Sequence, residues 1–128
     1  MEPITLIVTA LAAGASSGVI EGLTGTVKEN AKAAFAKLHE LTRRRFQGNT
    51  SAEVILSEYQ NDPATYEAPL AKKLAGVGAA DDTELLAAAK ALMELVDQTG
   101  ASSGKYNVTI KNSKGVQVGD GNTQFNKF

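Results

Sequence analysis

The side chains that could carry out chemistry in this chain are few and scattered. His39 is the only histidine, and the chain contains no cysteine. A general base or a metal ligand needs partners at fixed positions, and no carboxylate spacing singles out a partner for His39. The absence of cysteine excludes disulfides, thiolate zinc sites and thiol nucleophiles. The sequence therefore predicts no catalytic residues, no metal site and no cofactor, and we expect the protein not to be an enzyme.

The charged clusters fit the ends of helices better than they fit an active site. Asp81, Asp82 and Glu84 precede an apolar helical run, where Asp81-x-x-Glu84 is typical of a helix cap. Three arginines at 43–45 would end another helix, where the helix dipole favours positive charge. Contact with anionic lipid headgroups is the alternative for these arginines. The formal net charge of −1 provides no field that would attract nucleic acid, so we expect no nucleic-acid partner.

The elements that must position these groups are helices throughout residues 1–98. Capping boxes of the form Thr-x-x-Glu begin at Thr26 and Thr50, and apolar residues follow each of them at helical spacing. An Asp-Pro pair at 62–63 is typical of a helix start, while Pro69 predicts that this segment is kinked or begins again. We predict an all-α fold, an antiparallel bundle of about four or five helices, with a C-terminal amyloid-forming β segment.

The N-terminal segment is the most apolar part of the chain, with no charged residue from Pro3 to Ile20. A helix that is apolar on all sides is either wrapped inside a bundle or placed in lipid. A continuous helix over 3–20 would be about 27 Å long, close to the ~30 Å hydrocarbon core of a bilayer. Glycines at intervals of four would let such helices approach closely in lipid. Both interpretations remain open from the residues alone. The residues that would enter lipid are Ile4, Leu6, Ile7, Val8, Leu11, Gly14, Gly18 and Gly22.

A secretory signal is a further interpretation of the same segment. Residues 12–15, Ala-Ala-Gly-Ala, loosely resemble a cleavage site, which would make the chain a secreted helical protein. Glu2 argues against this, because a secretory signal opens with positive charge. We therefore expect the protein in the cytoplasm, whose reducing conditions also fit a chain without cysteine.

The character of the chain changes after residue 98. Residues 99–104 have the composition of a flexible linker, which would span about 13 Å as a random coil. Residues 105–128 alternate in places at the period of a strand, as in Tyr106 to Lys111. A hairpin of this size is marginal alone, whereas identical chains stacked in register would form a dry zipper with amide ladders. We predict a helical domain at 1–98, a linker at 99–104 and an amyloid motif at 105–128. A hairpin docked on the helical domain is the alternative.

Two parts of the sequence resemble known families. Val116-Gln117-Val118-Gly119 matches the (Ile/Val)-Gln-(Ile/Val/Leu)-Gly core of the RIP homotypic interaction motif of animal necroptosis proteins. The longer stretch 115–124 resembles the bacterial amyloid signalling motifs related to it. Residues 1–8, with their Ala/Gly-rich continuation, are similar to the starts of Bell domains. These domains are bacterial relatives of the fungal HeLo and HeLo-like domains and of the mixed-lineage kinase-like four-helix bundle.

The resemblance implies a cell-death effector. In such systems a NOD-like receptor with a matching motif passes its amyloid fold to the effector, whose helical domain then damages the membrane. The implied partners are this receptor, further copies of the chain in an amyloid and, after activation at the cell membrane, lipid. The implied amyloid core is Val116, Gln117, Val118, Gly119 and Asn122. Asp120-Gly121 departs from the Asn-rich continuation of the animal motif, so pairing with animal-type motifs is not implied. A soluble helical adaptor, which recruits partners through the motif without membrane damage, is the alternative function.

Overall fold

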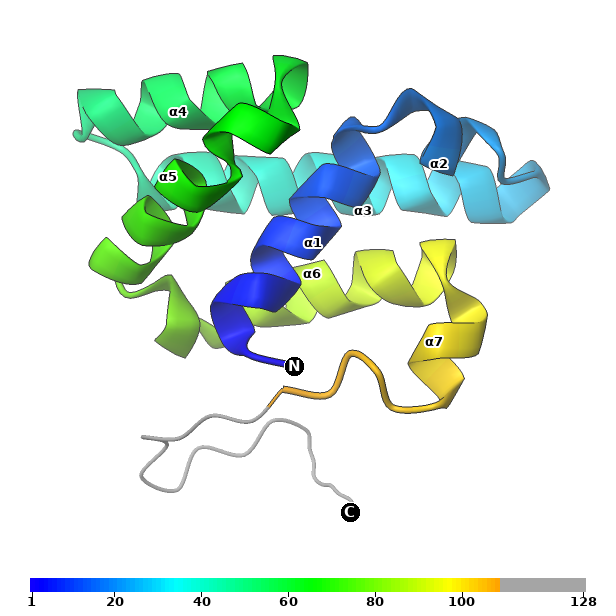
Figure 1. Ribbon diagram of the computed structural model, residues 1–128. Helices are drawn as coiled ribbons and strands as arrows, with labels where there is room; N and C mark the ends of the chain where they lie inside the picture. Colours follow the sequence, from blue (N-terminus) through cyan, green and yellow to red (C-terminus); the bar gives the residue numbers. More distant parts are fainter. Residues whose placement is uncertain (109–128) are drawn as a thin grey trace.

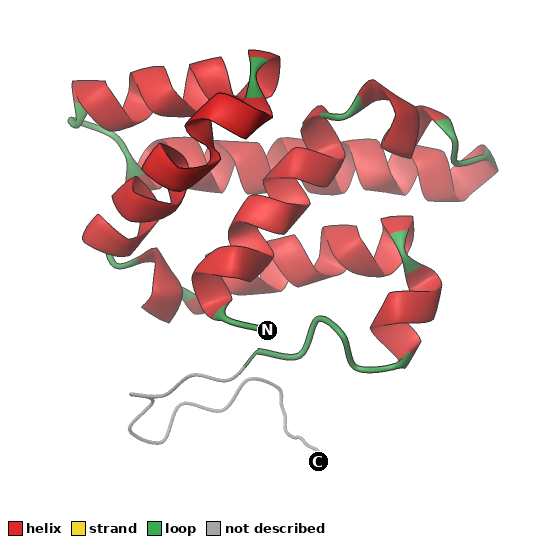
Figure 2. Cartoon of the chain, viewed as in Figure 1, coloured by secondary structure: helices red, strands yellow, loops and turns green. Residues whose placement is uncertain are grey.

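The computed structural model describes residues 1–108, and the regular structure in this range is helical, as Figure 2 shows. The predicted all-α class is therefore confirmed for these residues. Five of the described helices have 12 to 21 residues, and the short α2 and α7 have five each, so residues 1–108 form more helices than the four or five expected. In chain order the elements are α1 (Pro3–Ala15), α2 (Ser17–Glu21), α3 (Gly25–Arg45), α4 (Thr50–Asn61), α5 (Pro63–Gly76), the 3₁₀ turn η1 (Ala79–Asp81), α6 (Thr83–Val96) and α7 (Gln98–Ser102).

Helix α1 lies in the middle of the bundle. It crosses α3 and α6 obliquely, with α4 and α5 on the left of α1, and α2 and α7 on its right, in the view of Figure 1. Packing contacts join α1 to α3, α4, α5 and α6, as well as to α2 and η1. The first helix of the chain is thus the element around which the core forms. The largest fully buried side chains of the core come from α1, from α3 with its C-cap, and from α4 to α6. They are Leu6, Ile7, Leu11, Leu38, Thr42, Phe46, Tyr59, Leu70, Leu74, Leu85 and Leu92.

The helix starts lie one or two residues from the positions that the capping patterns predict. Helix α3 begins at Gly25, before Thr26. Asn49 caps α4, because its side-chain oxygen accepts a hydrogen bond from the backbone N–H three residues later at 3.1 Å. Asp82, rather than Asp81, caps α6 in the same way. Asparagine and aspartate are as good as threonine at this position, so a local pattern does not decide between neighbours.

Helix α5 begins where the Asp-Pro pair predicts. Asp62 is the N-cap, its carboxylate accepts a hydrogen bond from the Thr65 N–H at 3.3 Å, and Pro63 occupies the first turn. The expectation that the helix begins again at Pro69 is wrong, since α5 continues through this residue to Gly76. Pro69 still lacks an N–H, but the packing of α5 against α1 and α4 compensates for the lost helical hydrogen bond.

One carboxylate ties the end of α3 to the start of α6. The Asp82 Oδ2 atom accepts hydrogen bonds from Arg45 Nη2 at 2.7 Å and Arg45 Nε at 3.1 Å, while Oδ1 accepts from the Leu85 N–H at 3.1 Å. Burial would raise the pKa of Asp82, but the hydrogen bonds from Arg45 and Leu85 outweigh it and lower this pKa. Arg45 also donates to the Val77 carbonyl at 3.1 Å. Charge-assisted pairing of this kind fixes how the two helices meet.

The structure corrects two expectations about continuity. The single helix expected from Pro3 to Ile20 is broken, because Ser16 has φ −79° and ψ 117° and separates α1 from α2. Residues 98–102 form α7, which overlaps the stretch 99–104 whose composition predicts a coil. Both differences arise from tertiary packing: Ile20 is buried in the core after the break, and Tyr106 is buried beyond α7.

Candidate functional site

The apolar side chains of α1 that the sequence assigns to lipid are inside the bundle. Leu6 and Ile7 have no exposed surface, and Leu11 and Val8 are buried beside them. Ile4 is half-buried and packs against the same core. In this conformation α1 is therefore wrapped inside the bundle, the first of the two interpretations that the sequence left open.

A polar contact also fixes α1. The Tyr59 hydroxyl of α4 donates a hydrogen bond to the Val8 carbonyl at 3.3 Å, and both residues are buried. A buried hydroxyl without a partner would be unfavourable, so this bond favours one position of α4 along α1. The central helix is therefore positioned by a directional contact as well as by apolar packing.

The glycines expected to form one stripe have different surroundings. A Cβ atom at Gly14 would lie 1.9 Å from Cδ1 of Phe35, so α1 and α3 need a glycine there in order to touch. A Cβ at Gly18 would meet no atom within 4 Å, and one at Gly22 would lie 3.1 Å from the Gly18 carbonyl oxygen. Only Gly14 therefore has a packing role between helices of the bundle.

Gly14→Ala should lower the free energy of unfolding by about 1–3 kcal/mol, because the added methyl group forces the Phe35 ring out of place. Gly18→Ala is the matched control, and it should be neutral or stabilising by up to about 1 kcal/mol through the lost freedom of the unfolded chain. Urea unfolding followed by circular dichroism measures both variants. Equal effects of the two substitutions would contradict the packing role of Gly14.

The residues that follow α6 are held on the bundle by Asp97 and Tyr106. Tyr106 is 2% exposed, and its hydroxyl donates a hydrogen bond to Asp97 Oδ2. Asp97 Oδ1 accepts from the Gly100 N–H at 3.1 Å, and Lys105 Nζ lies 3.7 Å from Oδ2. The hydrogen bond from Tyr106 is the main cause that lowers the pKa of Asp97, while burial and Asp97 together raise the pKa of Tyr106 to about 12. This pair closes the turn that follows α7.

The start of α1 meets the same segment. The Met1 nitrogen donates a hydrogen bond to the Asn107 carbonyl at 3.0 Å, and Lys90 of α6 donates to the Asn107 side chain at 3.1 Å. Val108 is half-buried against the core. In Figure 1 the beginning of α1 and the segment after α7 lie at the same end of the molecule. Residues 105–108 are the first of the predicted amyloid motif, which therefore contacts the chain just before the central helix.

Comparison with known families gives this arrangement a context. The model of the Het-E N-terminal domain matches the chain over residues 1–128. The chain belongs to the Het-E N-terminal domain family. This is a HeLo-like family of fungal cell-death domains, associated with cell-death and incompatibility signalling. Neither the curated proteins nor the solved structures contain a significant match.

Membership of the Het-E N-terminal domain family confirms the coarser part of the expectations. The HeLo-like relationship and the helical fold agree with it. The specific relationship to bacterial Bell domains and the amyloid motif stay predictions. The residues of the predicted amyloid core lie outside those that the structure describes: Val116, Gln117, Val118, Gly119 and Asn122.

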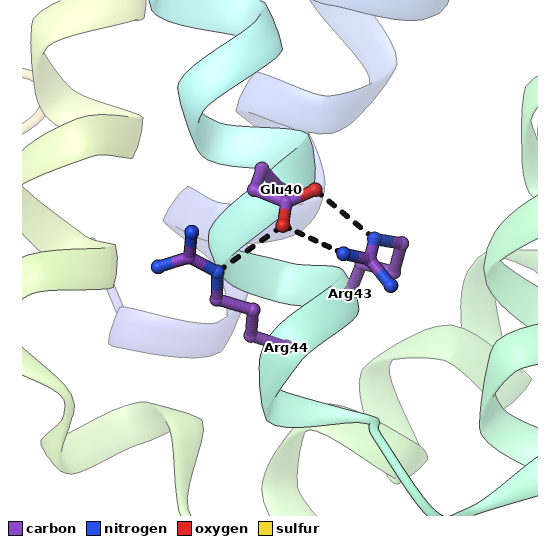
Figure 3. A network of polar contacts seen from close by, with 3 residues as sticks. All are labelled: Glu40, Arg43 and Arg44. Atoms are coloured by element: carbon purple, nitrogen blue, oxygen red, sulfur yellow. Dashed lines mark hydrogen bonds and ion pairs between the residues drawn. The ribbon is translucent and has the colours of Figure 1, made fainter.

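The arginine cluster of this Het-E N-terminal domain is paired within the protein. Figure 3 shows Glu40 between Arg43 and Arg44, with oxygen–nitrogen distances of 2.6 Å to Arg43 Nη2 and 3.1 Å to Arg44 Nε. The pKa of Glu40 is lowered to about 2, mainly by the hydrogen bonds that Arg43 donates to it. Since Arg45 binds Asp82, each of the three arginines has a carboxylate partner. The cluster is thereby explained as a helix end, and a headgroup site at 43–45 would compete with these pairs.

His39 is a residue of α3 and contacts Gln60 of α4. Its ring lies 6.0 Å from that of Phe35, and its Nε2 atom is within hydrogen-bond distance of Gln60 Nε2. Burial lowers the pKa of His39, which favours the neutral ring. Over residues 1–108 no three histidine, aspartate or glutamate side chains come together as metal ligands. His39 thus fits a packed histidine at a helix contact.

The length of the helices bears on the membrane interpretation. No helix formed by residues 1–108 is both long enough and apolar enough to cross a bilayer. The longest, α3, carries charged side chains along its length, and α1 has 13 residues.

The sequence pattern did not predict the Asp97–Tyr106 and Met1–Asn107 contacts. The one available signal was an aromatic residue, Tyr106, directly after a stretch of small polar residues.

Proposed function

We propose that this protein is a cell-death effector in which amyloid templating at residues 105–128 releases α1 from the bundle to permeabilise a membrane. The observation that carries the proposal is the contact between residues 105–108 and the chain just before α1. The nitrogen of Met1, just before α1, donates a hydrogen bond to the Asn107 carbonyl, and buried Tyr106 is bonded to Asp97 at the end of α6. Undocking of the C-terminal segment would therefore remove a contact at the start of α1, the most apolar helix.

The coupling follows from a conflict over residues 106–108. The sequence from Tyr106 to Lys111 alternates at the period of a strand. Tyr106 and Val108 nevertheless pack against the helical core. A side chain cannot lie in the core and in a stacked sheet at once. Stacking at ~4.8 Å per chain therefore favours undocking of this segment, and the lost contacts of Asn107 free the start of α1.

The partners follow from the same proposal. A NOD-like receptor with a matching motif supplies the template, further copies extend the amyloid, and lipid receives α1. The resting protein is cytoplasmic and the activated protein is at the cell membrane. Family membership in cell-death signalling supports this sequence of events, and the burial of α1 supplies the resting state.

A soluble adaptor is the second candidate. It is favoured by the burial of Leu6, Ile7 and Leu11, since a helix whose apolar side chains are covered needs no lipid. An adaptor would recruit a partner through residues 105–128 while the bundle stays closed. Substitution of Leu6 by aspartate does not separate the candidates, because a charge at this buried site would unfold the bundle itself.

Val19→Asp separates the two functions. Val19 belongs to the apolar N-terminal segment but is 37% exposed, so the bundle should tolerate a carboxylate there. An aspartate inside a bilayer is costly, so seeded membrane damage should fall at least tenfold. The matched control is Val54→Asp on α4, where the valine is 53% exposed and lies outside the apolar segment. The measurement is dye release from anionic liposomes, with preformed fibrils of a 105–128 peptide as the seed.

Four results together support the effector. Wild-type protein and Val54→Asp release dye only when seeded. Val19→Asp and Gln117→Asp release little dye even with the seed. Gln117→Asp places charge in the predicted amyloid core, where stacking in register would align like charges. Fibre growth of the wild type without any dye release would favour the adaptor.

A further inference from the structure

The break between α1 and α2 is confined to one dihedral angle. Ser16 has φ −79°, which is within the helical range, while its ψ of 117° is extended. Its N–H still bonds to the Ala12 carbonyl at 3.0 Å, and its carbonyl accepts from the Val19 N–H at 3.3 Å. Rotation of ψ at this residue to about −42° would join the two helices into one.

Joining the helices changes what the segment can do in a membrane. Helix α1 alone is about 20 Å long, whereas a helix from Pro3 to Glu21 would be about 28 Å long, close to the ~30 Å bilayer core. No charged residue occurs from Pro3 to Ile20, so Glu2 and Glu21 would flank the joined helix at the headgroups. We infer that Ser16 is a hinge that converts α1 and α2 into a single bilayer-length helix, an inference that rests on the proposed function.

The glycines support the joined conformation. Gly14 and Gly18 share a face only in a continuous helix, where residues four apart are neighbours. In the resting fold Gly14 packs on Phe35, but Gly18 faces open space. Glycine weakens a helix, and the packing of the bundle gives no reason for one at residue 18. In lipid, the joined helix presents Gly14 and Gly18 on one face, which lets the helices of neighbouring copies approach closely. Gly22, the residue after the joined helix, continues this spacing.

Contacts on both sides of Ser16 keep the resting helix bent. Before the break Gly14 is held against Phe35, and after it Ile20 is 7% exposed in the core. Glu21 pairs with Lys28 of α3 at 2.8 Å. A straight helix would carry Ile20 and Glu21 away from these partners. The hinge therefore opens only after α1 has left the bundle, which places it downstream of the release step.

Ser17→Pro tests the hinge by locking the bend. Ser17 is the first residue of α2, where proline is well tolerated. A proline also confines the preceding residue to the extended region that Ser16 already occupies. In the joined helix the same proline would be interior, where it breaks a helical hydrogen bond, so the joined population should fall about a hundredfold. Ser17→Ala is the matched control, and thermal unfolding of each variant checks the resting fold.

The readouts are seeded dye release and the gain in helicity on anionic vesicles, both with the full chain. Ser17→Pro should retain fibre growth, lose this gain in helicity and release dye about a hundredfold more slowly than Ser17→Ala. Ser16→Ala, which removes no capping hydrogen bond, should release faster than wild type and serves as the second variant if the proline variant is unstable. Release by a folded Ser17→Pro at the control rate, or no acceleration by Ser16→Ala, overturns the hinge while the effector function stands. Absence of release by the seeded wild type overturns both.

Discussion

Leu6→Ala should lower the free energy of unfolding by about 2–5 kcal/mol, because it removes a fully buried side chain from the centre of the bundle. Leu6 is in α1, which packs against α3, α4, α5 and α6, so the cavity has walls from several helices. Such a cavity collapses poorly, and the loss should lie toward the upper part of the range. Urea unfolding at constant m-value measures the change.

The same variant should also release dye without a seed. If burial in the core is what holds α1 back, a weaker core raises the population in which α1 is free. Val54→Ala on the exposed face of α4 is the control, and it should change the stability by less than about 0.5 kcal/mol and leave unseeded release at background. A Leu6→Ala protein that is destabilised but still silent without a seed would show that α1 is not restrained by the core.

Tyr106→Ala should detach residues 98–108 from the bundle. The ring is 2% exposed and its hydroxyl is bonded to Asp97, so truncation removes apolar burial and a charge-assisted hydrogen bond together, about 3 kcal/mol in all. The affected region follows α6, the last long helix, and the opening should therefore be local. Hydrogen exchange should show lost protection of amides 98–108, with α3 and α4 unchanged.

Tyr106→Phe is the matched control for the hydroxyl. It keeps the ring in the core and removes only the bond to Asp97, so the loss should be about 1 kcal/mol. Seeded release should start earlier in Tyr106→Ala than in Tyr106→Phe, because the segment that must undock is already free. Identical lag times in the two variants would mean that docking of residues 105–108 does not limit activation.

Several features could be predicted from the sequence because their causes are local. The Asp-Pro pair set the start of α5 through the N-cap bond of Asp62 and the fixed φ of Pro63. Apolar residues at helical spacing predicted the other long helices, although the caps of α4 and α6 lie one residue from the expected ones. Both offsets have the same reason: neighbouring residues of similar capping strength compete, and the surrounding contacts choose between them.

The state of α1 was decided only by the tertiary structure. A core and a bilayer select the same apolar pattern, so the residues of this helix predicted burial without predicting what surrounds it. The break at Ser16 depends on the packing of Ile20, and docking of the segment after α7 depends on a bond between Asp97 and Tyr106. The sequence by itself determined that residues 1–98 are mainly helical and that the first helix must be covered. The tertiary structure decided that the bundle covers it, because only the fold brings α3 to α6 around α1.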